Sequence, residues 1–113
     1  MNNKDRFILP EGAESIFFIG ICGISMSSLA SITHTHGIKV GGSDTNDGEM
    51  AAKLRSEGIE IFIGHSADNL KGYDAVVYTA AIAETNPELV YARENGLPCI
   101  NRAEYLGKLM LAY

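Results

Sequence analysis

The sequence predicts an α/β domain with a doubly wound, parallel sheet of five strands in the order 3-2-1-4-5. Short apolar runs alternate with amphipathic helical segments along most of the chain. The apolar runs are continuous, which is typical of strands covered by helices on both faces. Glycine or asparagine stands at most of the predicted helix boundaries. Right-handed crossovers then give a single Rossmann-like domain, with a ligand crevice at the carboxyl ends of strands 1 and 4.

The predicted strands are rich in β-branched and aromatic residues, as strands usually are. Each is bounded by glycine or by a polar residue, and a helix or helical turn separates it from the next strand. In chain order the strands are Ile16–Ile19, Ile38–Val40, Ile59–Ile63, Ala75–Tyr78 and Leu97–Ile100.

Capping residues place the first two helices between these strands. The first helix follows Gly23 and stops at Gly37, because glycine is the favoured residue just beyond a helix end. The second begins near Asn46 or Asp47 and ends at Gly58 for the same reason. Both therefore connect neighbouring strands as crossover helices.

The later helical segments have equally clear ends. Ser66–Leu70 is expected to form one short turn. Asn86 and Pro87 are a helix cap followed by proline at the first helical position, and that helix ends at Asn95 and Gly96. A final helix begins with a capping box formed by a polar residue and a glutamate three positions later. That pair is Asn101 and Glu104, and the helix's predicted buried stripe is Leu106, Leu109, Met110 and Tyr113.

Composition limits the kind of partner that this domain can bind. The 113 residues suit one domain, which we place at residues 15–113 after a leader at residues 1–14. Nine basic and fourteen acidic residues give a net charge of -5, which argues against a nucleic-acid or anionic-membrane surface. The chain shows no secretory signal or membrane span, and its two cysteines are too few for a disulfide framework. The expected location is the cytoplasm.

The most informative segment runs from Gly20 to Met26, between the first strand and the first helix. A chain that reverses here exposes backbone N–H groups at the positive end of the helix dipole, which favours a diphosphate. The dinucleotide fingerprint G-x-G-x-x-G is only partly present, because Cys22 and Ser25 replace its second and third glycines. A tight turn without a ligand is therefore the alternative. We interpret Cys22 as a small loop residue and not as a reactive thiol.

A second candidate is the acidic residue at the end of strand 2. Asp44 lies 24 residues after Gly20, close to the spacing at which a carboxylate accepts hydrogen bonds from a ribose. The alternative is that Asp44 only stabilises the turn into the second helix.

Together these motifs resemble the Mur ligase family, the ATP-dependent amide-bond formers of peptidoglycan synthesis, and most closely its alanine-adding branch. The resemblance covers about residues 15–110. Its motifs are Gly20–Ala30, Gly42-Ser43-Asp44, Ile63-Gly64-His65, Thr79-Ala80-Ala81-Ile82, Asn86-Pro87-Glu88 and Asn101-Arg102-Ala103-Glu104.

The resemblance implies an N-terminal domain that binds UDP-N-acetylmuramate and does no chemistry of its own. The family's ATP loop is absent from this chain, so ATP, Mg²⁺ and catalysis belong to further domains of a longer parent protein. We therefore expect no catalytic residue, no metal site and no cofactor here. The implied ligand contacts are Gly20, Cys22, Gly23, Ile24, Ser25, Met26, Ser43, Asp44, Thr45, His65, Thr79, Ala80, Ala81, Asn86 and Arg102.

Three other functions remain compatible with these residues. One is the branch of the same family that recycles a tripeptide onto the same UDP-sugar. The second is an NAD(P)- or FAD-binding domain of an oxidoreductase, which suits Asp44 but not the incomplete glycine pattern. The third is a ligand-sensing regulatory domain with the same fold.

Overall fold

The computed structural model describes residues 14–112, with side chains as far as residue 109. The predicted leader at residues 1–14 lies outside the described residues, apart from Glu14, whose backbone N–H donates to Asp74 Oδ2 at 2.9 Å. The elements in chain order are β1 (Ser15–Ile19), α2 (Ile24–Thr35), β2 (Lys39–Asp44), α3 (Glu49–Ser56), β3 (Glu60–Ile63), the 3₁₀ turn η1 (Ala67–Leu70), β4 (Ala75–Tyr78), α4 (Pro87–Glu94), β5 (Cys99–Asn101) and α5 (Arg102–Ala112).

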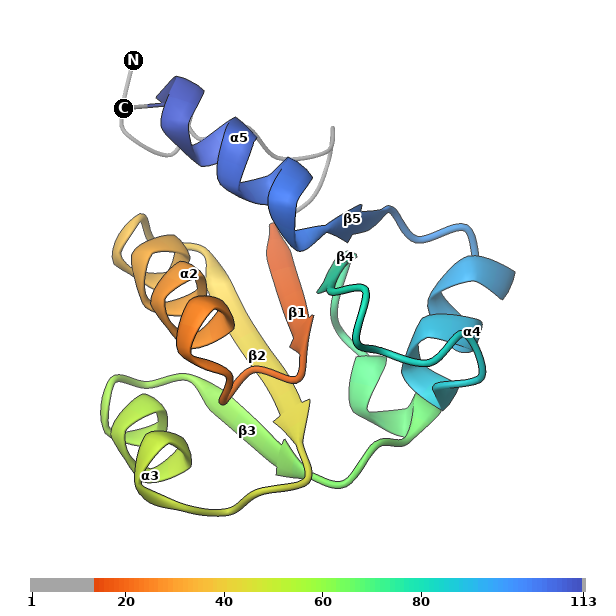
Figure 1. The fold of residues 1–113 in the computed structure, drawn as a ribbon, viewed down its shortest axis with the longest axis horizontal. Helices are drawn as coiled ribbons and strands as arrows, with labels where there is room; N and C mark the ends of the chain where they lie inside the picture. Colours follow the sequence, from red (N-terminus) through yellow and green to blue (C-terminus); the bar gives the residue numbers. More distant parts are fainter. Residues whose placement is uncertain (1–13, 113) are drawn as a thin grey trace.

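The strands form one five-stranded sheet in the order β3-β2-β1-β4-β5, and every pairing is parallel. The predicted fold class and strand order are confirmed. Because the strands are parallel, all five carboxyl ends lie at one edge of the sheet. The β1–α2 loop lies against the end of β2 at this edge (Figure 1).

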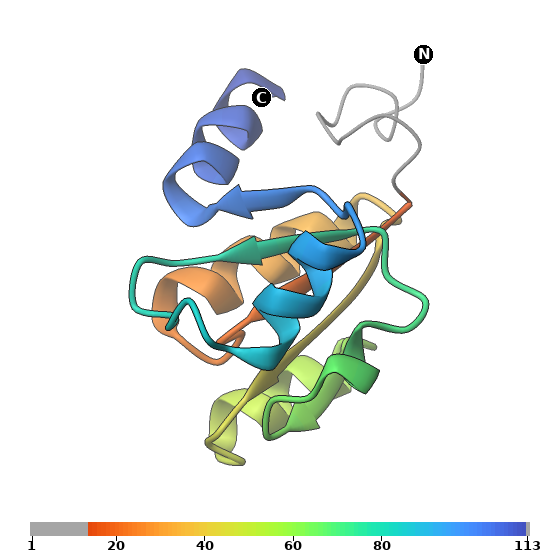
Figure 2. The ribbon, with the colours of Figure 1, turned by 90° about the vertical axis from the view of Figure 1, so that its right-hand side faces the viewer.

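Helices cover both faces of this sheet (Figures 1 and 2). Successive residues of β1 serve opposite faces: Ile16 and Phe18 pack with α2, α3 and α5, while Phe17 and Ile19 pack with η1 and α4. All four side chains are fully buried. A strand that must be apolar on both faces has a continuous apolar sequence, as β1 has.

The strand β2 is longer than predicted, because it continues through Gly41 and Gly42 to Asp44. Glycine is normally unfavourable in strands, but larger residues have no room here. A Cβ at position 42 would lie 2.4 Å from the carbonyl oxygen of Phe18, and one at position 41 would lie 2.6 Å from Cζ of the Tyr73 ring. Close packing therefore explains both glycines without a ligand.

The buried stripe of α5 differs from the prediction. Tyr105 is fully buried and Leu109 nearly so, whereas Leu106 is 39% exposed. The predicted stripe is therefore wrong at Leu106, and the side chains of residues 110 and 113 lie outside the described part. Tyr105 packs edge-on against Phe18, and its hydroxyl lies 2.5 Å from Thr33 Oγ1. That partner satisfies the buried hydroxyl, which allows tyrosine to take the inward position.

The two kinds of glycine environment predict opposite effects of substitution. Gly42→Ala is expected to destabilise the domain by about 1–3 kcal/mol, because its methyl group meets backbone that cannot move away. Gly107→Ala, in α5 with no atom within 4 Å of the added Cβ, is the matched control. It is expected to stabilise the domain by roughly 0.5–1 kcal/mol, the helix-propensity gain. Urea unfolding measures both, and a neutral Gly42→Ala contradicts the packing argument.

Candidate functional site

The sequence-predicted site residues come together at the carboxyl edge of the sheet. Every segment that carries them begins at or just after the end of a strand, and the parallel pairing aligns those ends. In the order of the strands across the sheet, the segments begin at Gly64, Asp44, Gly20, Thr79 and Asn101. This edge is where open parallel sheets bind their ligands.

The β1–α2 loop uses most of its own amides internally. Gly20, at a φ of 80° that favours glycine, and Ile21 both donate their N–H to the carbonyl of Ser43, at 2.8 and 3.0 Å. Cys22 N–H donates to Asp44 Oδ2 at 3.0 Å, and Gly23 N–H donates to the Gly20 carbonyl at 3.2 Å. The amides of residues 20–23 are therefore not the open donors that the sequence predicted.

The open donors lie one step further along, in the first turn of α2. Within residues 14–112, no acceptor bonds the N–H groups of Ile24, Ser25 and Met26, and Gly23 caps the helix without a side-chain hydrogen bond. A Cβ at position 23 would approach only the Gly20 carbonyl oxygen, at 3.5 Å. Internal packing thus does not require glycine there. Its absent side chain leaves the positive end of α2 accessible.

Arg102 adds a full positive charge to this helix end. It is the first residue of α5, directly after β5, and its Nη1 donates to Ser25 Oγ at 3.0 Å. Asn101 caps the start of α5, where its Oδ1 accepts from Ala103 N–H at 2.9 Å. The cap is confirmed, although no described bond runs back from Glu104 to Asn101. A guanidinium beside open helix amides is suited to binding an anion such as phosphate.

Asp44 stabilises the turn after β2, which is the alternative role that the sequence analysis left open. Its Oδ1 accepts from Asn46 N–H and its Oδ2 from Cys22 N–H, both at 3.0 Å. The carboxylate therefore links β2 to the β1–α2 loop, and it is still partly exposed beside the exposed Thr45. A contact with a ribose stays a prediction for both residues.

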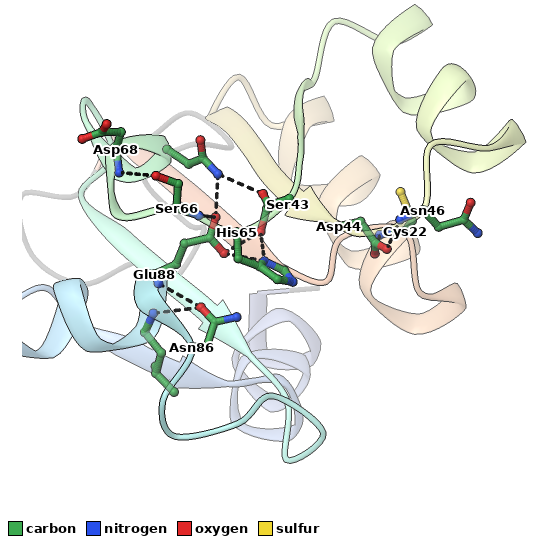
Figure 3. Close-up of polar contacts among 12 residues, drawn as sticks. Cys22, Ser43, Asp44, Asn46, His65, Ser66, Asp68, Asn86 and Glu88 are labelled. Atoms are coloured by element: carbon green, nitrogen blue, oxygen red, sulfur yellow. Dashed lines mark hydrogen bonds and ion pairs between the residues drawn. The ribbon is translucent and has the colours of Figure 1, made fainter.

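A buried polar cluster centred on Glu88 was not predicted by the sequence analysis. This carboxylate is fully buried, and four donors converge on it (Figure 3). Oε1 accepts from Ser43 Oγ at 2.6 Å and lies 2.8 Å from His65 Nδ1. Oε2 accepts from Asn69 Nδ2 at 2.8 Å and from Ser66 N–H at 3.4 Å. These four hydrogen bonds offset the cost of burying a polar side chain.

One sequence signal for this cluster exists. Glu88 precedes Ala92 by four residues and adjoins Leu89, so it lies on the inward stripe of α4. The cluster also changes two predicted contacts. Ser43 is fully buried with its hydroxyl bonded to Glu88, which removes that hydroxyl from the candidate ligand contacts. His65 remains 23% exposed at its side chain, and within residues 14–112 only its Nδ1 is engaged.

The β4–α4 loop contributes the remaining predicted residues. Thr79 Oγ1 accepts from Ala81 N–H at 3.2 Å, so this hydroxyl shapes its own loop. Ala80 and Ala81 are exposed. Asn86 caps α4, since its Oδ1 accepts from the N–H groups of Glu88 and Leu89 at 2.9 and 3.3 Å. The predicted cap is confirmed, and the cap accounts for the asparagine.

No described helix is long and apolar enough to cross a membrane. Among the described side chains, no three histidine, cysteine, aspartate or glutamate residues are grouped as metal ligands. The site thus presents backbone amides, one guanidinium and one partly exposed imidazole to a ligand.

The environment of Cys22 predicts that its thiol reacts slowly with alkylating reagents. Burial, and then the nearby Asp44 carboxylate, raise the pKa of this thiol above its ordinary value, despite the helix N-terminus beside it. A raised pKa leaves less thiolate at neutral pH, and only the thiolate reacts. In a Cys99→Ser variant, alkylation by iodoacetamide at pH 7 is therefore expected to be slower than that of free cysteine. Its rate should still be rising above about pH 8.5. Rapid reaction at pH 7 would contradict this.

The comparisons with known proteins agree with this architecture. The family model for the Mur ligase family, catalytic domain, matches residues 15–113. A UDP-N-acetylmuramate–L-alanine ligase of Clostridium botulinum is 55% identical over 97 residues, which is 86% of this chain and 21% of that protein. The chain therefore spans about a fifth of the length of this relative.

Two solved structures share the fold. The crystal structure of a UDP-N-acetylmuramate-alanine ligase from Thermotoga maritima matches 85% of this chain and 22% of that one, with a TM-score of 0.82 and 42% identity. A murein peptide ligase from Psychrobacter arcticus matches 84% of this chain and 20% of that one, with a TM-score of 0.78 and 30% identity. On its sequence and on its structure, the chain belongs to the Mur ligase family.

Proposed function

We propose that this domain binds UDP-N-acetylmuramate within a cytoplasmic, ATP-dependent ligase that joins L-alanine to that sugar nucleotide. Family membership supports a ligase as the parent protein. The alanine-adding branch is favoured because relatives with that name reach 55% and 42% identity, against 30% for the murein peptide ligase.

The observation that carries the proposal is the meeting of Arg102 with the open end of α2. Arg102 Nη1 lies 3.0 Å from Ser25 Oγ. No acceptor in the described part of the chain bonds the neighbouring amides of Ile24, Ser25 and Met26. Paired phosphates carry charge that both the guanidinium and the helix dipole stabilise. In a chain with a net charge of -5, this local arrangement supplies the attraction that the whole molecule does not.

The other parts of the ligand follow from the strand order. A diphosphate over β1 places the ribose toward Asp44 at the end of β2 and the base toward His65 beyond β3. The sugar then extends the opposite way, over the exposed Ala80 and Ala81 after β4. Thr45 directly follows Asp44 after β2, and Asn86 ends the β4–α4 loop.

The chemistry of the parent enzyme is expected to need the rest of the protein. In this proposal the carboxylate of the muramate is phosphorylated by ATP, and the amine of L-alanine then displaces phosphate from the acyl phosphate. ATP and Mg²⁺ act in the further domains. This domain binds and orients the UDP-sugar, and by itself it is expected to be inactive.

Removing the guanidinium tests the phosphate site directly. Arg102→Ala is expected to weaken binding of UDP-N-acetylmuramate by roughly 10- to 100-fold, because it removes charge-assisted hydrogen bonds of about 1.5–3 kcal/mol. Lys71→Ala is the matched control, since it removes one exposed positive charge before β4, at the opposite edge of the sheet. Isothermal titration calorimetry measures the affinities.

The same titration separates the classes of ligand. Binding of UDP-N-acetylmuramate and UDP, with no heat from NAD or NADP, is the expected result. Binding of NAD alone, with no response to either uridine nucleotide, would overturn the proposed function. Equal affinities of wild type and Arg102→Ala would remove Arg102 from the site.

A substitution at Gly23 tests ligand binding without a change in stability. Gly23→Ala is expected to leave the unfolding free energy nearly unchanged, because its Cβ would be 3.5 Å from its nearest neighbour and the backbone φ of -61° suits any residue. The methyl group would stand in front of the α2 amides, so affinity for UDP is expected to fall at least about tenfold, the loss of one good hydrogen bond. Unchanged affinity in a folded variant would exclude close phosphate approach at Gly23.

A further inference from the structure

The buried Glu88 carboxylate lies behind His65, one of the residues of the proposed nucleotide site. It lies at the second position of α4, where Asn86 and Pro87 begin the helix. Being fully buried, it cannot touch a ligand itself. It does touch His65, which is partly exposed and follows β3 (Figure 3).

The hydrogen bonds around Glu88 determine which nitrogen of His65 carries the proton. Ser43 Oγ donates to Glu88 Oε1 at 2.6 Å, so the single hydroxyl hydrogen is already used. His65 Nδ1 lies 2.8 Å from the same carboxylate oxygen and 2.9 Å from Ser43 Oγ. Both carboxylate oxygens of Glu88 already accept hydrogen bonds, Oε1 from Ser43 and Oε2 from Asn69 and Ser66. Nδ1 must therefore carry the hydrogen and donate it.

The other ring nitrogen is then left with a lone pair. In a neutral imidazole with Nδ1 protonated, Nε2 is an acceptor. No residue in the described part of the chain bonds Nε2, and it is not among the buried polar atoms that lack a partner. Nε2 is therefore available to a donor group of a ligand.

We propose that Glu88 is a positioning residue that holds His65 as the Nδ1–H tautomer, so that Nε2 accepts a hydrogen bond from the N3–H of a uracil base. This rests on the proposed function, which places the base beyond the end of β3. Neighbouring strands lie about 4.8 Å apart, so His65 is about two strand spacings from the diphosphate over β1. N3–H is the one ring donor of uracil, whereas cytosine has an acceptor there.

The tautomer is measured first, without a ligand or a variant of the cluster. In the chain labelled with ¹⁵N-histidine at pH 7, long-range ¹H–¹⁵N spectra are expected to show a protonated Nδ1 and an unprotonated Nε2 for His65. The signal is assigned by its loss in His65→Gln. A protonated Nε2 with a bare Nδ1 would overturn the proposal.

Three variants, one of them a control, then test whether Glu88 holds His65 as the Nδ1–H tautomer. Glu88→Gln can turn an amide N–H toward Nδ1, so His65 is expected to become a mixture of tautomers. Glu94→Gln, on the exposed side of the same helix, is the control and should leave the signal unchanged. Ser43→Ala keeps the carboxylate and should keep Nδ1–H, which also tests the proposal if Glu88→Gln fails to fold. Loss of Nδ1–H in Ser43→Ala alone would assign the role to Ser43.

Binding of two nucleotides tests the base contact and keeps it apart from the proposed function. UDP is expected to bind the wild type at least about tenfold more tightly than N3-methyl-UDP, which lacks the donor. In Glu88→Gln this ratio is expected to shrink, while Glu94→Gln retains it. Equal binding of the two nucleotides by the wild type would overturn the inference and leave the nucleotide site intact. Absence of binding by both UDP and UDP-N-acetylmuramate would instead refute the proposed function.

Discussion

Ser43 is the residue through which the two parts of the site depend on each other. Its carbonyl accepts from the amides of Gly20 and Ile21, which sets the start of the β1–α2 loop. Its hydroxyl donates to Glu88, which sets α4 and His65. The residue is fully buried, so each polar group must find a protein partner. Because one short strand end satisfies both demands, the β1–α2 loop and the Glu88–His65 cluster share one anchor.

The electrostatic potential of the site also depends on a few local groups. The chain is acidic, yet the candidate ligand is an anion. The positive potential is local: it comes from the open first turn of α2 and from the Arg102 guanidinium. Asp44 accepts from the amides of Cys22 and Asn46, and Glu88 accepts from the Ser43 hydroxyl. Both acidic side chains therefore have hydrogen-bond donors within the fold.

Particular residues show how much of the structure local sequence patterns predict. The caps at Asn86 and Asn101 were predictable because a cap acts on amides two or three residues away. Leu106 was wrongly placed inside, because periodicity alone does not distinguish it from the neighbouring Tyr105, whose hydroxyl has a partner on α2. The full length of β2 was not predicted because Gly41 and Gly42 are poor strand formers. Both positions need glycine because Tyr73 and Phe18 leave no room for a side chain.

The sequence by itself determined the fold class, the strand order and the edge at which the site residues gather. These follow from continuous apolar runs, helix ends and crossover handedness, which are properties of short segments. Only the tertiary structure decided which amides remain open and which side chains face inward. Cys22 meets Asp44, Ser43 meets Glu88 and Ser25 meets Arg102 across separations of 22, 45 and 77 residues. A hydrogen bond between distant segments depends on how those segments pack, and no local pattern encodes that.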